Sequence, residues 1–330
     1  MHTRTLGKSG PAVSAVGLGC LGLTGAYGQA PEDASLALLR RAVDSGVTLL
    51  DTADFYGGGA GEELIGRAVA DCRDEVVLAT RGGVSAAFPG GPPTLIDGTP
   101  ARLKQACEDS LRRLGTDRID LYYLGRIDPA VPVEESVGAL AELVAVGKVR
   151  HIGLSEAGPD QLRRAHAVHP VAALESEYSL WERHVEDDIL PVTRELGIGF
   201  VAHSPLGRGF LTGTLTSTEG FGDKDIRRNH PRFQGENFDR NRVLLAAVQE
   251  AAAVRGVTTG QLVLAWLLSR GEDIVPIPGT RSEKHLLLNA AAADITLTAA
   301  ESDRLAALLP PEAVAGPRHP GHRAAQKSAS

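Results

Sequence analysis

Short apolar runs alternate with amphipathic stretches along most of the chain. The runs are nearly continuous in Val, Ile, Leu and Ala, which is typical of parallel strands buried on both faces. They predict strands at 14–18, 47–50, 75–80, 119–124, 149–154, 171–176, 198–202 and 274–277.

The stretches between these runs have helical periodicity. Residues 101–114 carry apolar or small side chains at Leu103, Cys107, Leu111 and Leu114, which form one face of a helix. Similar patterns predict helices at 33–44, 61–70, 133–144, 159–167, 185–196, 240–254, 258–269, 282–291 and 299–308.

Eight strands, each followed by at least one helix, predict an α/β fold of the (β/α)8 TIM-barrel type with extra helices, which needs roughly 250 residues. A doubly wound sheet also fits the strand count. Residues 4–13, with the turn Ser9-Gly10-Pro11, predict an N-terminal hairpin that could plug the barrel floor.

Two regions depart from the alternating pattern. Residues 204–239 form a long loop rich in Gly, Arg and Asn, which a barrel would place on its substrate-binding face. Residues 310–330 consist mostly of Pro, Ala, Gly, His and Ser and predict a flexible C-terminal tail. We therefore expect one barrel domain over residues 1–309.

Composition narrows the class of protein. The 330 residues are 43% hydrophobic and 23% charged, with a net charge of −7, and no basic block suggests nucleic-acid binding. No apolar run approaches the roughly 18 residues of a membrane span, and no signal-peptide pattern opens the chain. The three cysteines are an odd number without metal-site spacing, so we expect a cytoplasmic enzyme acting on a small molecule. The oligomeric state cannot be inferred from these features.

Residues 17–22 spell Gly-Leu-Gly-Cys-Leu-Gly and formally match the dinucleotide-binding pattern G-x-G-x-x-G. That pattern requires its third glycine to open a helix whose amides face the pyrophosphate. Here the next helix signal, at Pro31, comes nine residues after Gly22. We therefore expect a strand-to-helix loop at the barrel mouth instead of a Rossmann site.

The sharpest chemical feature is the segment Asp51-Thr-Ala-Asp-Phe-Tyr56-Gly57. A carboxylate ends a buried strand, and a tyrosine follows five residues later before a glycine-rich turn. Asp51 and Tyr56 are therefore candidate catalytic residues at the barrel mouth. The alternative is a helix-capping Asp and a packing Tyr.

Several long motifs occur in the order known for the aldo-keto reductase superfamily, which the chain resembles from Arg4 to about Leu308. They are VGLGC, DTADFYG…GEELIGRAV, VRHIGLSEA, ESEYSLWER, ILPVTRELGIGFVAHSPLGRGFLTG and PIPGTR…LLLNAAA. The resemblance implies a (β/α)8 barrel that binds NADPH without a Rossmann domain. It also implies carbonyl reduction by an Asp, Tyr, Lys and His tetrad, in which the tyrosine supplies a proton and a cation lowers its pKa.

This sequence matches only half of that tetrad, at Asp51 and Tyr56. By the resemblance, Arg81 stands at the lysine position and Gly125 at the histidine position. An arginine keeps the charge but cannot act as a proton relay. We hypothesise that the Arg81 guanidinium occupies the space of the missing imidazole.

The resemblance also implies an NADP(H) site. At the nicotinamide end, Ser155 matches a carboxamide contact, Glu175 replaces a glutamine, and His203 replaces a stacking tyrosine. Leu288 stands where a Glu is frequent. The remaining cofactor-binding candidates are Ser204, Leu206, Gly207, Gly209, Gly279, Thr280, Arg281 and Asn289.

Three functions fit these residues. The protein could be an NADPH-dependent reductase of a specialised carbonyl, imine or enone compound, with a non-standard catalytic tetrad. It could be a redox-neutral enzyme on the same scaffold, or a catalytically lapsed NADP-binding protein. No metal site is expected, because His319 and His322 lie in the predicted tail without a third ligand.

Overall fold

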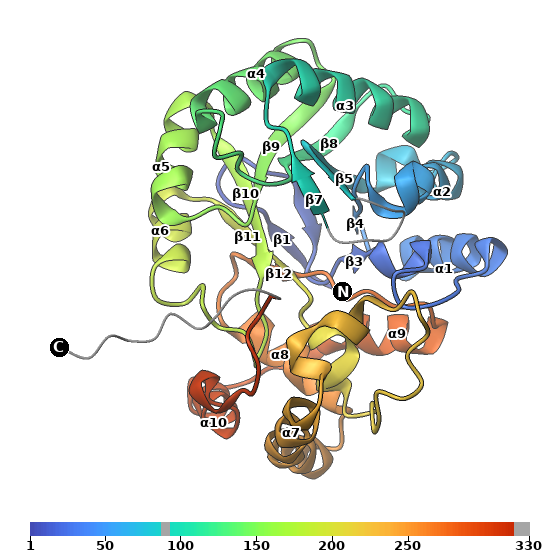
Figure 1. Ribbon diagram of the computed structural model, residues 1–330, viewed down its shortest axis with the longest axis vertical. Helices are drawn as coiled ribbons and strands as arrows, with labels where there is room; N and C mark the ends of the chain where they lie inside the picture. Colours follow the sequence, from blue (N-terminus) through green and yellow to red (C-terminus); the bar gives the residue numbers. More distant parts are fainter. Residues whose placement is uncertain (87–92, 320–330) are drawn as a thin grey trace.

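The protein is an eight-stranded parallel barrel surrounded by helices (Figure 1). The structure is a computed structural model that describes residues 1–86 and 93–319. The sheet order is β12-β11-β10-β9-β8-β5-β4-β3, and each neighbouring pair is parallel. The two edges meet where the Gly17 amide donates to the Pro276 carbonyl at 2.9 Å. This contact favours the predicted barrel over the doubly wound alternative.

All eight predicted strands overlap observed barrel strands, the first of them at a single residue. The barrel consists of β3 (Leu18–Gly19), β4 (Leu49–Asp51), β5 (Val77–Gly82), β8 (Ile119–Leu124), β9 (Val149–Ser155), β10 (Val171–Glu177), β11 (Gly199–His203) and β12 (Ile274–Pro276). The first strand overlaps its prediction of 14–18 only at Leu18, because Ser14 pairs within the hairpin and 15–17 connect the hairpin to the barrel.

All ten predicted helices are present, with shifted ends. They are α1 (Glu32–Asp44), α2 (Ala60–Ala68), α3 (Pro100–Leu114), α4 (Val133–Ala145), α5 (Pro159–Val168), α6 (Ile189–Leu196), α7 (Glu236–Arg255), α8 (Thr259–Ser269), α9 (Glu283–Ala291) and α10 (Ala299–Leu308). No single helix in the described part of the chain could cross a membrane. Helices α7 and α8, which are bent by 92° relative to each other, together have the length and apolar composition of a membrane span.

The predicted N-terminal hairpin is confirmed as β1 (Thr3–Thr5) and β2 (Ala12–Ser14). Leu6 and Val13 are fully buried against the side chains that fill the barrel interior, such as Leu121 and Val201. The Arg4 guanidinium donates to the carbonyls of Gly271 and Ile274, both at 2.7 Å, and of Leu268 at 3.0 Å. The hairpin therefore plugs the floor of the barrel.

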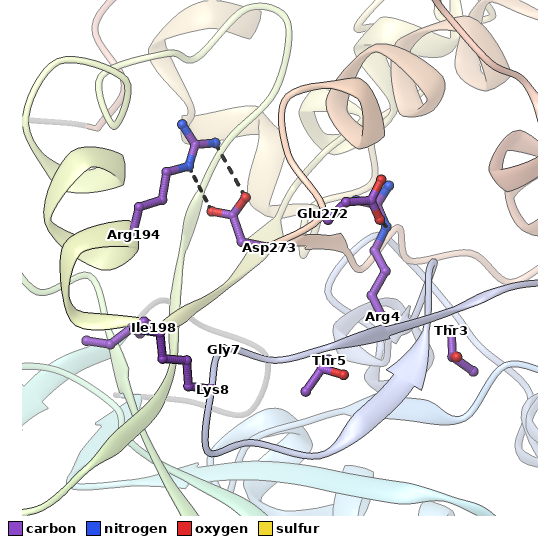
Figure 2. Close-up of a pocket in the computed structure, with 10 residues that line it drawn as sticks. Thr3, Arg4, Thr5, Gly7, Lys8, Arg194, Ile198, Glu272 and Asp273 are labelled. Atoms are coloured by element: carbon purple, nitrogen blue, oxygen red, sulfur yellow. Dashed lines mark hydrogen bonds and ion pairs between the residues drawn. The ribbon is translucent and has the colours of Figure 1, made fainter.

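A depression of about 550 Å3 lies beside this plug (Figure 2). Its lining includes Arg4, Lys8, Arg194 and Asp273, and Arg194 is paired with Asp273 at 3.0 Å. The candidate catalytic and cofactor-binding residues are absent from this lining, because the strands carry them to the opposite, C-terminal end of the barrel.

A second hairpin was not predicted. β6 (Val84–Ala86) pairs antiparallel with β7 (Pro93–Ile96) after barrel strand β5. The segment around it is rich in Pro and Gly and has no period-two alternation, so no pattern there predicts a strand.

The loop 204–239 contains the short 3-10 helices η4 (Gly207–Thr212), η5 (Ile226–Asn229) and η6 (Pro231–Phe233). Phe210 packs on Trp181 with ring centroids 4.2 Å apart, and both side chains are buried. Aromatic packing therefore fixes this loop over the end of β10.

The segment expected as a flexible tail from residue 310 lies against the barrel as far as Arg318. The Ala315 amide donates to Asn241 Oδ1 at 2.8 Å, and Asn241 Nδ2 donates back to the Ala315 carbonyl at 2.9 Å. The prediction missed this because the anchors are backbone atoms of Ala315 and the side chain of Arg318, and composition does not reveal their partners. Residues 320–330, including His322, lie outside the described residues.

Candidate active site

A buried arginine joins two strands of the barrel at its C-terminal end. Arg81, near the end of β5, donates through Nη2 to Asp51 on β4 and through Nη1 to Glu175 on β10. Its Nε donates to the Thr52 carbonyl at 3.1 Å. All three charged side chains are at most 5% exposed. Asp51, Arg81 and Glu175, together with Tyr56, form the central group.

The central group has two carboxyl groups for one guanidinium. Burial raises the pKa of Asp51 well above its ordinary value; Arg81 lowers it, and Glu175 raises it. Asp51 Oδ2 is buried without a hydrogen-bond partner in the described residues. The burial of Asp51 and the nearby acid Glu175 therefore favour a protonated Asp51 carboxyl group.

Tyr56 lies at the start of the 3-10 helix η2 (Tyr56–Gly59). The Arg81 guanidinium carbon is 5.7 Å from the centre of its ring, and no hydrogen bond joins the Tyr56 hydroxyl to another described residue. Desolvation raises the pKa of Tyr56 by more than Arg81 lowers it. The expected lowering by a cation is therefore present but outweighed, so the phenol stays protonated and can donate a proton.

Gly125 follows β8 and has no room for a side chain. A Cβ atom at this position would lie 2.9 Å from the Gly82 carbonyl oxygen and 2.9 Å from Val84 Cγ2. Arg81 instead points toward Asp51 and Glu175. The nearest atoms to a Cβ at position 125 belong to Val84 and the β5 backbone, and the hypothesis that the Arg81 guanidinium fills the imidazole space stays a prediction.

Arg126, the next residue, was missed by the sequence analysis. Its Nη1 donates to the Gly125 carbonyl at 2.7 Å and to Ser155 Oγ, at the end of β9, at 2.9 Å. A charged residue directly after a barrel strand was the signal that could have identified it.

A second set of charged residues forms the rim cluster: Glu156, Glu177, His203, Arg208 and Arg318. His203 Nε2 lies 2.7 Å from Glu156 Oε1, and Arg318 Nη2 donates to the same oxygen at 2.5 Å. Glu177 accepts from Arg208 at 2.8 Å and from Arg318 at 2.9 Å. The end of the described chain therefore contributes to the barrel mouth.

Electrostatics in the rim cluster differ from those of the central group. Burial raises the pKa values of Glu156 and Glu177, but cationic neighbours and hydrogen bonds hold both well below the ordinary range. The cluster therefore keeps its carboxylates ionised.

Three residues with a strained backbone conformation lie in or next to the rim cluster. Glu156, Ser204 and Arg208 have positive φ values of 57°, 50° and 57°, and they are the only non-glycine residues of the described chain that do. Such conformations persist where the surroundings impose them, often at functional sites. Leu206, Gly207 and Gly209 belong to the turn that carries Arg208, within or next to η4.

The remaining candidates form an outer end near the N-terminus of α9: Gly279, Thr280, Arg281 and Asn289. A Cβ at Gly279 would lie 2.9 Å from the Gly19 carbonyl oxygen, so the close approach of these two backbone segments requires glycine. Arg281 Nη1 donates to the Gln29 carbonyl at 2.6 Å. The Asn289 side chain is buried yet makes no hydrogen bond within the described residues.

The predicted site residues thus lie in or beside three groups: the central group, the rim cluster and the outer end. Asp51, Arg81 and Glu175 are joined directly, His203 joins Glu156, and Ser155 contacts Arg126. The outer end connects to the mouth through residues 26–29: the Ile226 amide donates to the Ala26 carbonyl at 3.1 Å, and Arg227 lies over the Tyr27 ring at 5.1 Å.

The aldo/keto reductase family model matches residues 15–310, so the chain belongs to that family of oxidoreductases. It is 44% identical over 316 residues to the "Probable aldo-keto reductase 1" of Glycine max, covering 95% of this chain and 90% of that protein.

Solved structures give the same result. A glycerol dehydrogenase from Gluconobacter oxydans has a TM-score of 0.83 at 30% identity, covering 94% of this chain and 96% of that one. An aldo/keto reductase from Klebsiella pneumoniae in complex with NADP and acetate has a TM-score of 0.72 at 30% identity, covering 93% and 96%.

Proposed function

We propose that this protein is an NADP(H)-dependent reductase with a non-standard active centre, acting on a specialised small carbonyl, imine or enone compound. The central group carries this proposal: a protonated tyrosine lies beside a buried arginine that is held by two acids. An imine or an activated enone fits this centre because it accepts hydride with little polarisation of a carbonyl oxygen.

The outer end fits an adenine dinucleotide phosphate. Thr280, Arg281 and the amides at the start of α9 suit the phosphate on the adenosine ribose, and the unused Asn289 amide suits the adenine. Leu206, Gly207 and Gly209 would face the pyrophosphate. The family resemblance assigns Ser155, Glu175, His203 and Ser204 to the nicotinamide end.

When bound, NADPH supplies the hydride. Tyr56 donates the proton, since its raised pKa keeps the hydroxyl protonated at neutral pH. Arg81 holds Asp51 and Glu175 and places a positive charge near the phenol. Glu175 accepts hydrogen bonds but cannot donate one while ionised, so it would hold only the NH2 group of a carboxamide.

No side chain at position 125 can donate to a substrate oxygen. Removal of one such donor costs enzymes about 10²–10³-fold in rate, so we expect slow turnover of simple ketones. A redox-neutral reaction and a lapsed, cofactor-binding role are the competing functions. Three free cysteines support a cytoplasmic location for any of them.

Titration of the protein with NADPH, followed by cofactor fluorescence, tests the proposal together with turnover assays on aldehydes, enones and cyclic imines. We expect binding, and oxidation of NADPH with at least one imine or enone. Tyr56→Phe should abolish turnover and retain binding. Binding without turnover across the panel would favour the competing functions, and absence of binding would exclude the reductase.

A further inference from the structure

Arg126 has no acidic partner in the described chain, as is also true of Arg281 at the outer end, whereas five other arginines near the barrel mouth are paired. Those arginines are paired with carboxylates: Arg81 with Asp51 and Glu175, Arg208 with Glu177, Arg227 with Asp225, Arg232 with Glu182, and Arg318 with Glu156 and Glu177. No carboxylate of the described chain lies within 4.0 Å of the Arg126 guanidinium. A half-buried cation therefore faces the mouth with its charge unpaired.

The Arg126 guanidinium is oriented by the protein. Both contacts, to the Gly125 carbonyl and to Ser155 Oγ, use the same nitrogen, Nη1. A guanidinium carries five N–H donors, so the edge formed by Nε and Nη2 has no partner among the described residues. Two parallel donors on one edge match the two oxygens of a carboxylate.

The place of this edge connects it to the reacting centre. Ser155 ends β9, next to Glu175 in the register of β9 and β10, and Glu175 is bound to Arg81. Gly125 has no side chain that could stand between Arg126 and the mouth. The Arg81 guanidinium is already engaged by two acids, so Arg126 is the cation left for a ligand.

We propose that Arg126 binds the carboxylate of an oxo-acid substrate, and this inference rests on the proposed reductase function. In the reaction the carbonyl carbon gains a hydride from NADPH and its oxygen gains the proton of Tyr56. The C=O double bond becomes a C–OH single bond, and NADPH becomes NADP+. A neighbouring carboxylate group draws electrons from a 2-oxo carbon, which lessens the need for the donor that position 125 lacks.

The test compares phenylglyoxylate with its methyl ester, which has the same ketone without the charge. We expect the wild-type kcat/KM to favour the acid. Arg126→Met should lower kcat/KM for the acid about 100-fold more than for the ester, because a charge-assisted bidentate contact is lost. Arg126→Lys should recover part of the difference. Arg228→Met, which removes a half-exposed cation paired with Asp223, is the matched control and should change neither value.

Calorimetric titration with oxamate, a non-reducible analogue of a 2-oxo acid, separates this inference from the reductase proposal. We expect oxamate to bind to the wild type in the presence of NADPH and to lose that binding in Arg126→Met. Absence of oxamate binding, or equal loss of acid and ester turnover, would overturn the role of Arg126. If NADPH binding itself fell in Arg126→Met, the arginine would be a cofactor contact instead. If NADPH failed to bind to the wild type, the reductase proposal would fall first.

Discussion

The outer end and the central group use polar residues in opposite ways. At the outer end, Asn289 keeps an unused amide and the exposed Arg281 makes one contact, to a backbone carbonyl. In the central group, Arg81 is held by two side chains and one backbone carbonyl, all buried. Free donors are suited to binding a ligand that arrives from solvent, whereas paired buried charges fix a geometry.

This difference indicates where substitutions act on stability and where they act on binding. Breaking a buried ion pair leaves an uncompensated charge in the interior. This lowers the free energy of unfolding far more than the loss of an exposed ion pair does. The central group should therefore affect folding and chemistry together, while the outer end should affect affinity alone.

The largest effect is expected from Arg81→Met. The variant leaves Asp51 and Glu175 buried without a cation, so the free energy of unfolding should fall by about 3–5 kcal/mol. Urea denaturation at pH 7 measures this. The double variant Arg81→Met with Glu175→Gln should recover part of the loss, because it also removes one of the two acids that have lost their cation. Equal losses in the two variants would mean that the pairing does not govern stability.

Asp54, in the loop after β4, should make stability depend on pH. Burial, followed by the charge of Glu62, raises the pKa of its carboxyl from 3.8 to about 7. Between these values the folded state holds the proton that the unfolded state has lost, so stability falls as pH rises through this window. At pH 8 the free energy of unfolding of Asp54→Asn should therefore be higher than that of the wild type, by at most about 4 kcal/mol. The advantage should vanish below pH 4; an advantage that persists there would exclude this cause.

Gly125→His should lower stability, by about 1–3 kcal/mol, because its Cβ meets Gly82 and Val84 too closely. Adding Val84→Ala should relieve one of the two contacts and recover part of the loss, as measured by thermal unfolding. Val84→Ala alone is the control. If Gly125→His were as stable as the wild type, the backbone at this position would be free to shift.

The smallest effect is expected at the outer end. Arg281→Met should weaken NADPH binding about tenfold and leave NADH binding unchanged, since only the former carries the ribose phosphate. Fluorescence titration with both cofactors measures this, and unfolding curves should match those of the wild type. Equal weakening for the two cofactors would place Arg281 elsewhere in the site.

The sequence predicted the barrel, its helices and the plug because these depend on periodicity, which is local. It also placed Asp51 and Tyr56 at the mouth, since residues that follow strand ends share one edge, and the family resemblance added Arg81. The bridge from Arg81 to Glu175 could not be predicted, because those residues are 94 positions apart and only the closed barrel brings them together.

The rim cluster shows the same limit. Arg318 lies in a segment whose composition suggested a free tail, and nothing local indicates its contacts with Glu156 and Glu177. The contacts of Arg126 with Ser155, and of Val84 with position 125, depend on which way each side chain points. Such orientations follow from three-dimensional packing and leave no periodic pattern.

The contacts of the two chain ends have a consequence for biosynthesis. Arg4 bonds to a carbonyl 270 positions away, and Arg318 bonds to a carboxylate 162 positions away. During synthesis from the N-terminus, the first hairpin must wait for β12 before its arginine is satisfied, and the mouth is completed only when residue 318 has been made. The barrel mouth can therefore reach this arrangement only after residue 318 has been translated.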